Sequence, residues 1–268
     1  MTTTLAMPHR LDRSILINAS RETVFGYFTD STRWARWWGQ GSTIDARAGG
    51  AVQIVHPGGV QVAGEILEID PPTRLVFTYG YVSGTPMPVG ASVVTIRLED
   101  DQQGTRLDLS HVFADEKVRD EMVQGWRFQL SLFGNLVAND VHAGASTAVD
   151  GWFATWSEPD TAKREALLDR LVTEEVRFRD RFSLIDGLSD LRPHLAAVHK
   201  FMPGMRLERD GDIRHCQGTV LADWVARTVD GSERGRGTNV FALGHHGRIE
   251  AVTGFWNPPK SATPGTLR

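Results

Sequence analysis

The chain has 268 residues, which suits two domains better than one, because single domains usually run to about 100–150 residues. Its 41% hydrophobic and 23% charged residues are ordinary for a globular protein, and no apolar run approaches the ~18 residues that a membrane helix needs. The formal net charge of -4 offers no basic surface, so we expect neither nucleic acid nor a membrane as a partner.

The first residues and the cysteine count indicate a compartment. The opening stretch MTTTLAMPHRLDRS lacks the apolar segment of a secretory signal, and the single Cys216 cannot form an internal disulfide. We therefore expect a cytoplasmic protein.

Three of the eight tryptophans lie within five positions of the sequence TDSTRWARWWGQG. Trp34, Trp37 and Trp38 follow helical i, i+3, i+4 spacing, so on a short helix they share one face. One interpretation is that the rings anchor this helix to the core, where aromatic side chains contribute most to burial. The other is that Trp37 or Trp38 also forms a cavity wall on which a ligand stacks.

Alternating patterns predict antiparallel strands over residues 94–100 and 105–113, with DDQQG as part of the turn between them. His111 falls on the apolar face of the second strand, where the ring either bonds to a ligand or satisfies a buried protein group. Phe77, Tyr79 and Tyr81 also share one strand face, which would suit an apolar pocket.

A long amphipathic helix is predicted over residues 116–140, with Asp115 as its N-cap and Trp126 on its apolar face. The next stretch, HAGASTAVDG, is small, polar and weakly patterned, which favours a linker. We expect a first domain over 1–142, a linker over 143–155 and a second domain over 156–268.

The first half resembles a known family in several ordered stretches: NASRETVFGYFTDSTRWARWWG, GEILEIDPPTRLVFTYG, VTIRLEDDQQGTRLDLSHVF and GWRFQLSLFGNL. They are similar to the family of the activator of heat-shock-protein-90 ATPase homologue, within the START/SRPBCC helix-grip superfamily. The resemblance implies a curved antiparallel sheet around a long C-terminal helix, with a cavity between them that binds apolar molecules in many relatives. The ligand-binding candidates here are Trp37, Trp38, Phe77, Tyr79, His111 and Trp126.

The second half begins with helices. Residues 161–172 and 188–204 show helical patterns, residues 174–182 alternate as a strand, and further strands are expected around Arg206, Val220, Val240 and Ala251. This order predicts an α+β domain with helices packed on a curved antiparallel sheet.

Asp180 is the leading candidate for chemistry. In EEVRFRDRF it alternates with Val176, Phe178 and Phe182 on one face, while arginines occupy the other. A carboxylate in such a pocket is either a general acid or base, or an ordinary buried group with satisfied hydrogen bonds. His194 lies on an apolar helix face, so it is either a core residue or a partner of Asp180.

The stretches VRFRDRFSLIDGLSDLRPHLAAVHKFMPG and GTNVFALGHHGRIEAVTGFW resemble the SnoaL-like branch of the nuclear-transport-factor-2-like superfamily. That resemblance implies a cone-shaped α+β fold with an interior pocket. Asn239 stands where it leads us to expect an acidic residue, and an amide can orient a ligand but cannot take its proton. We expect Phe178, Trp224 and Asn239 to line this pocket.

Taken together, these patterns predict a two-domain protein that binds small apolar molecules in internal cavities, with no cofactor and no metal. An isomerase- or cyclase-like enzyme that uses Asp180, with His194 beside it, is the alternative; a co-chaperone-like protein-binding module is a weaker one. Adjacent His245 and His246 are expected in a solvated turn with their rings apart. A homodimer through the second domain is also expected, because relatives with this fold often pair.

Overall fold

A computed structural model describes residues 6–257. The chain divides into two compact units, Met1–Val141 and His142–Arg268, and each has its own hydrophobic core. Both units are mixed α+β with one mainly antiparallel sheet, which confirms the expected fold class.

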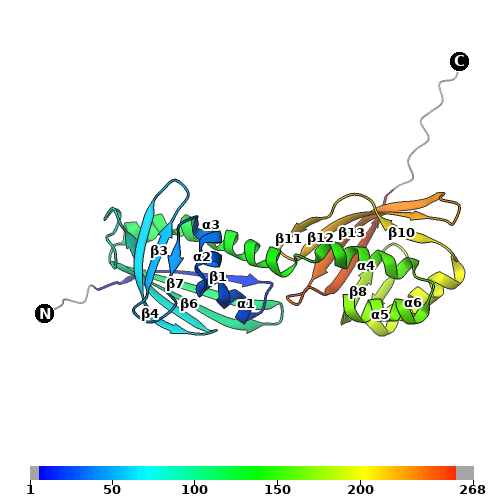
Figure 1. The fold of residues 1–268 in the computed structure, drawn as a ribbon, viewed down its shortest axis with the longest axis horizontal. Helices are drawn as coiled ribbons and strands as arrows, with labels where there is room; N and C mark the ends of the chain where they lie inside the picture. Colours follow the sequence, from blue (N-terminus) through cyan, green and yellow to red (C-terminus); the bar gives the residue numbers. More distant parts are fainter. Residues whose placement is uncertain (1–5, 258–268) are drawn as a thin grey trace, which may run out of the picture. The chain divides into compact units, whose positions relative to one another are not determined.

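The first unit wraps a seven-stranded antiparallel sheet against one long helix. The strand order is β1-β7-β6-β5-β4-β3-β2, with elements β1 (His9–Ile17), β2 (Thr43–Ile44), β3 (Ala51–Val55), β4 (Gln61–Asp70), β5 (Arg74–Tyr81), β6 (Ser92–Asp101) and β7 (Gly104–Phe113). Between β1 and β2 stand α1 (Arg21–Phe25), the 3-10 helix η1 (Gly26–Phe28) and α2 (Ser31–Trp38). Helix α3 (Glu116–Val141) packs on β1 and β7 (Figure 1).

The predicted start of α3 is confirmed by its cap. Asp115 Oδ1 accepts a hydrogen bond from the backbone N–H of Val118 at 2.9 Å, which satisfies one of the free donors of the first turn. Gly134 lies over the sheet, where a Cβ atom would be 3.7 Å from Ile15 Cδ1, an ordinary contact. A Cβ at Gly125 would meet nothing within 4 Å. Neither glycine is therefore needed for a close backbone approach.

The second unit places three helices on a second sheet. Helices α4 (Ala145–Ser157), α5 (Thr161–Leu171) and α6 (Leu188–Phe201) accompany strands β8 (Val172–Arg179), β9 (Leu184–Asp186), β10 (Arg206–Arg209), β11 (Arg214–Cys216), β12 (Thr219–Arg227), β13 (Glu233–Leu243) and β14 (Ile249–Trp256). The order is β10-β12-β13-β14-β8-β9, with β11 beside β12, and only the β14–β8 pairing is parallel. Asp160 caps α5 through the N–H of Lys163, at 3.0 Å.

The stretch expected as a linker, 143–155, falls mostly inside helix α4, so its interpretation as irregular chain is wrong. Val149, Trp152, Phe153 and Trp156 stand at i, i+3, i+4 and i+7, and all four are buried in the second core. This apolar stripe fixes the helix, although the small residues around it resemble those of a linker.

Candidate functional site

The second unit contains a cavity of about 420 Å³ between helices α4 and α6 and the sheet. Its walls are mainly aromatic and aliphatic: Trp152, Trp156, Phe178, Val198, Met205, Leu207 and Trp224. The polar residues of this wall are Asp180, Ser183, His194, Arg234 and Asn239. Phe178, Trp224 and Asn239 thus lie where the sequence placed them.

Asp180 reaches the cavity from a turn rather than from a strand. Strand β8 ends at Arg179, and the N–H of Asp180 donates to the carbonyl of Ser183 at 3.0 Å. Phe182, expected on the buried face, is instead 71% exposed, because the alternation stops where the turn begins. The carboxylate accepts from the N–H of Phe182 at 2.8 Å and from Trp256 Nε1–H at 3.2 Å. Two donors therefore hold the carboxylate in place.

Asn239 and Asp180 are neighbours on either side of Gly254. A Cβ atom at Gly254 would lie 3.0 Å from Asn239 Oδ1 and 3.1 Å from Asp180 Cβ. A larger residue would push the two side chains apart, so this glycine permits an amide and a carboxylate to share one part of the cavity wall.

His194 lines the same cavity but does not complete a catalytic pair with Asp180. Its Nε2 lies 3.3 Å from Ser183 Oγ, and its ring packs on that of Trp156 at 5.9 Å between centroids. No hydrogen bond joins His194 to Asp180 in the part of the chain that the structure describes, and the contact with Ser183 fixes the ring at the wall.

Three of the four tryptophans in the wall of the second cavity have an indole N–H without a partner among the described residues. Trp152, Trp156 and Trp224 each have a buried Nε1 without a hydrogen-bond partner among residues 6–257, whereas Trp256 donates to Asp180. A buried donor without an acceptor costs about 1–3 kcal/mol. Three rings of the cavity wall therefore carry a buried indole N–H that no described protein atom satisfies.

The first unit contains a cavity of about 440 Å³ between helix α3 and one end of the sheet. Aromatic rings dominate its wall, namely Trp37, Trp38, His56, Tyr79, Tyr81 and Trp126, with Met122, Phe128 and Leu132 beside them. The Nε1 atoms of Trp37 and Trp38 are buried and also lack partners among the described residues. Four of the six residues expected to line this cavity are in its wall.

The other two expected residues, Phe77 and His111, do not line this cavity. Phe77 is fully buried in the core. His111 is held within a hydrogen-bonded chain: its Nδ1 accepts from Trp126 Nε1–H at 2.9 Å, and its Nε2 lies 2.8 Å from Ser92 Oγ. Ser92 Oγ–H in turn donates to the carbonyl of Tyr79, so Nε2 carries the proton. Burial lowers the pKa of His111 to about 3, and the ring is a neutral core group.

The three tryptophans of α2 have two roles: Trp34 holds the helix to the sheet, and Trp37 and Trp38 form part of a cavity wall. Trp34 is completely buried, and its Nε1–H donates to the carbonyl of Gln53 on β3 at 3.2 Å, which ties the helix to the sheet. Trp37 and Trp38 pack against each other with centroids 4.3 Å apart and form part of the cavity wall. Gln129 of α3 donates to the carbonyl of Trp37.

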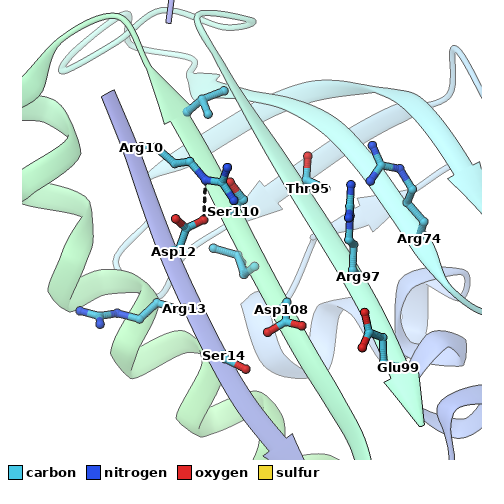
Figure 2. Close-up of a pocket in the computed structure, with 12 residues that line it drawn as sticks. Arg10, Asp12, Arg13, Ser14, Arg74, Thr95, Arg97, Glu99, Asp108 and Ser110 are labelled. Carbon is cyan, nitrogen blue, oxygen red and sulfur yellow. Dashed lines mark hydrogen bonds and ion pairs between the residues drawn. The ribbon is translucent and has the colours of Figure 1, made fainter. Parts of the chain in front are cut away.

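A third hollow, about 760 Å³, lies on the sheet face of the first unit formed by β1, β5, β6 and β7, and no sequence motif indicated it. Figure 2 shows its polar lining, including Arg74 and Arg97, which are directly opposite each other on β5 and β6. Arg10 pairs with Asp12 at 2.6 Å. Charged groups of both signs line this hollow, so it differs in chemistry from the aromatic cavities.

Residues 18–138 match the family described as activator of Hsp90 ATPase homolog 1-like protein. No curated protein matches the chain, and no helix among the described residues is long and apolar enough to span a membrane.

Solved structures similar to this chain come from several bacteria. One is a SnoaL-like family protein from Agrobacterium tumefaciens, named as a candidate isomerase, with 25% identity, a TM-score of 0.41, and coverage of 44% of this chain and 99% of the other. CalU16 from Micromonospora echinospora has 29% identity and a TM-score of 0.38, covering 47% and 72%. The Aha1 dimer from Colwellia psychrerythraea has 17% identity and a TM-score of 0.40, covering 46% and 90%.

Both resemblances expected from the sequence are represented among these matches. The N-terminal half, over residues 18–138, resembles the activator of Hsp90 ATPase homolog 1-like family.

Proposed function

We propose that the protein binds mainly apolar, aromatic small molecules in its two cavities, and that these ligands carry hydrogen-bond acceptors such as carbonyl oxygens. The aromatic walls support the first part of this proposal, because flat rings stack favourably on indole and phenol rings. Volumes of about 420 and 440 Å³ are within the usual range for small-molecule sites.

The observation that carries the proposal is a set of cavity-wall tryptophans whose indole N–H has no protein acceptor. Five of the eight have a buried Nε1 without a partner among residues 6–257, and all five line a cavity: Trp37, Trp38, Trp152, Trp156 and Trp224. The other three have protein acceptors: Trp34, which lines neither cavity, and Trp126 and Trp256, which line one cavity each. A ligand oxygen would satisfy such donors, whereas a pure hydrocarbon would leave them unpaired.

A matched pair of probes tests this chemistry. Fluorenone and fluorene are both flat tricyclic molecules, but only fluorenone carries a carbonyl oxygen. We expect calorimetry to show tighter binding of fluorenone, and Trp156→Phe or Trp37→Phe to reduce its affinity about 5- to 10-fold, the effect of one hydrogen bond. Neither variant should change the affinity for fluorene by as much.

Trp34→Phe is the control, because this ring lies outside both cavities. Equal affinity for the two probes, or loss of fluorenone binding in the control alone, would contradict the proposed ligand chemistry. Native mass spectrometry of the protein as purified provides an independent check, since a retained ligand adds a defined mass.

A second candidate function is proton transfer at Asp180. It is favoured by the carboxylate and the Asn239 amide facing one cavity across Gly254, an arrangement able to remove a proton next to a carbonyl group that the amide holds. Exchange of the α-protons of 2-tetralone in D₂O, followed by NMR, separates the two functions. An enzyme should accelerate exchange and lose this acceleration in Asp180→Asn; a binding protein should leave exchange at its solution rate in both forms.

A further inference from the structure

The hairpin between β13 and β14 carries the sequence GHHGRIE, Gly244 to Glu250, and forms the expected turn, but its two histidine rings are arranged differently from the expectation. The N–H of Gly244 donates to Arg248 O and that of Gly247 to Gly244 O, each at 2.8 Å. The rings of His245 and His246 do not point apart: their centroids are 4.9 Å from each other. The tight turn therefore gathers two imidazoles.

Glu250, the second residue of strand β14, lies beside the two histidines. Its Oε1 lies 3.7 Å from His246 Nε2, and one ligand atom from each of His245, His246 and Glu250 lies within 4.8 Å of the others. Gly244 is required for this arrangement, because a Cβ atom there would be 2.1 Å from Glu250 Oε1 and 2.6 Å from His246 Cε1.

Unused nitrogen atoms accompany the cluster. His245 Nδ1 is buried and has no hydrogen-bond partner among the described residues. His142 lies against the same turn, with Nε2 3.0 Å from the carbonyl of Gly244. A carbonyl only accepts, so Nε2 of His142 carries the proton and its Nδ1 keeps a lone pair, which is also buried without a partner in residues 6–257.

We propose that His245, His246 and Glu250 bind a divalent transition-metal ion of the zinc class. Two imidazoles and one carboxylate are a donor set that such ions prefer, and three protein ligands leave a position for water or another ligand. The unpaired His245 nitrogen is the observation that separates this cluster from an ordinary surface turn.

Two neighbouring interactions set the conditions for binding. The N–H of Arg248 donates to His246 Nδ1 at 3.1 Å, so coordination through Nε2 requires this hydrogen bond to break and the ring proton to leave Nε2. The His246 side chain is 37% exposed, so a metal ion can reach it from solvent. The Arg248 guanidinium donates hydrogen bonds to the backbone carbonyls of Asp169 and Val172, which hold it in place.

The test uses the full chain without any histidine tag and with Cys216→Ser, because this exposed thiol is itself a zinc ligand. Titration calorimetry with Zn²⁺ should give one site per chain, and Co²⁺ should give the visible absorption of a bound ion. His245→Ala and the isosteric Glu250→Gln should each weaken binding by more than about tenfold, the least expected when a metal ligand is lost.

His9→Ala, a histidine of the first unit, is the matched control and should keep the parent affinity. Circular dichroism checks that each variant is folded, and Glu250→Gln remains informative if His245→Ala is not. The proposal is wrong if the parent binds Zn²⁺ only at millimolar concentrations, or if both ligand variants bind it as tightly as the parent.

Discussion

His111 should make the first unit sensitive to acid in a way that one substitution can isolate. The buried ring is neutral because its Nδ1 accepts from Trp126 Nε1–H and its Nε2 donates to Ser92 Oγ. A second proton would have to go on Nδ1, directly opposite the indole N–H. Burial accordingly lowers the pKa of His111 to about 3.

The direction of the pH effect on stability follows from how many protons His111 binds in the folded and the unfolded protein. In the unfolded chain the imidazole has a pKa of about 6.5, so it takes up a proton as the pH falls, whereas the folded protein does not until the pH approaches 3. Unfolding therefore becomes easier between these two values. Proton linkage over this interval lowers the free energy of unfolding by about 2 kcal/mol between pH 7 and pH 5.

The assay is urea denaturation followed by circular dichroism at both pH values, with His111→Gln as the comparison. Glutamine offers one acceptor and one donor without a titrating proton. On acidification from pH 7 to pH 5, the free energy of unfolding of the variant should therefore fall by about 2 kcal/mol less than that of the parent. His56 also has a pKa lowered by burial, but it is present in both proteins and cancels in the difference. An identical pH dependence of parent and variant would refute the reasoning.

Three further predictions concern the first unit, and one concerns assembly. Trp34→Ala should lower the free energy of unfolding by about 3–5 kcal/mol in denaturant titrations, since the ring is fully buried. Gly125→Ala should raise it by about 0.5–1 kcal/mol, because the added Cβ meets nothing within 4 Å and favours the helix. Tyr27 has a pKa of about 12, raised first by burial and then by its hydrogen bond to Asp140, so Asp140→Asn should bring its ultraviolet titration to lower pH. The homodimer stays a prediction, and light scattering that gives a monomer at high concentration would contradict it.

The long helix and the α+β order of the second unit were readable from sequence because their signals are local. Residues 116–140 carry one apolar stripe and a capping aspartate, and the observed helix extends only one residue further, to Val141. Helix α4 was missed because Gly144, Gly151 and several small residues dilute its stripe. Short strands such as β9 and β11 carry too few residues to show any period.

Most residues expected at the two cavities line them, but Phe77 and His111 do not, and the geometry was harder to predict. Alternation placed Asp180 at the second cavity, yet the carboxylate reaches the wall through a turn that ends the alternation. Neither partner of His111 could be predicted, because Trp126 and Ser92 come from other elements of the fold. Which indole N–H groups lack partners depends on the complete tertiary packing, and no sequence pattern carries that information.

The division of the tryptophans between anchored and unpartnered rings has an optical consequence. Indole fluorescence responds to hydrogen bonding and to the polarity around the ring, so emission from the seven cavity-wall rings, five of them unpartnered, should change when a cavity fills, while Trp34 gives a constant background. Trp37, Trp38 and Trp126 line the first cavity, and Trp152, Trp156, Trp224 and Trp256 line the second. Each unit thus contains its own built-in spectroscopic reporter of occupancy, and removing one set of rings would make the emission specific to the other unit.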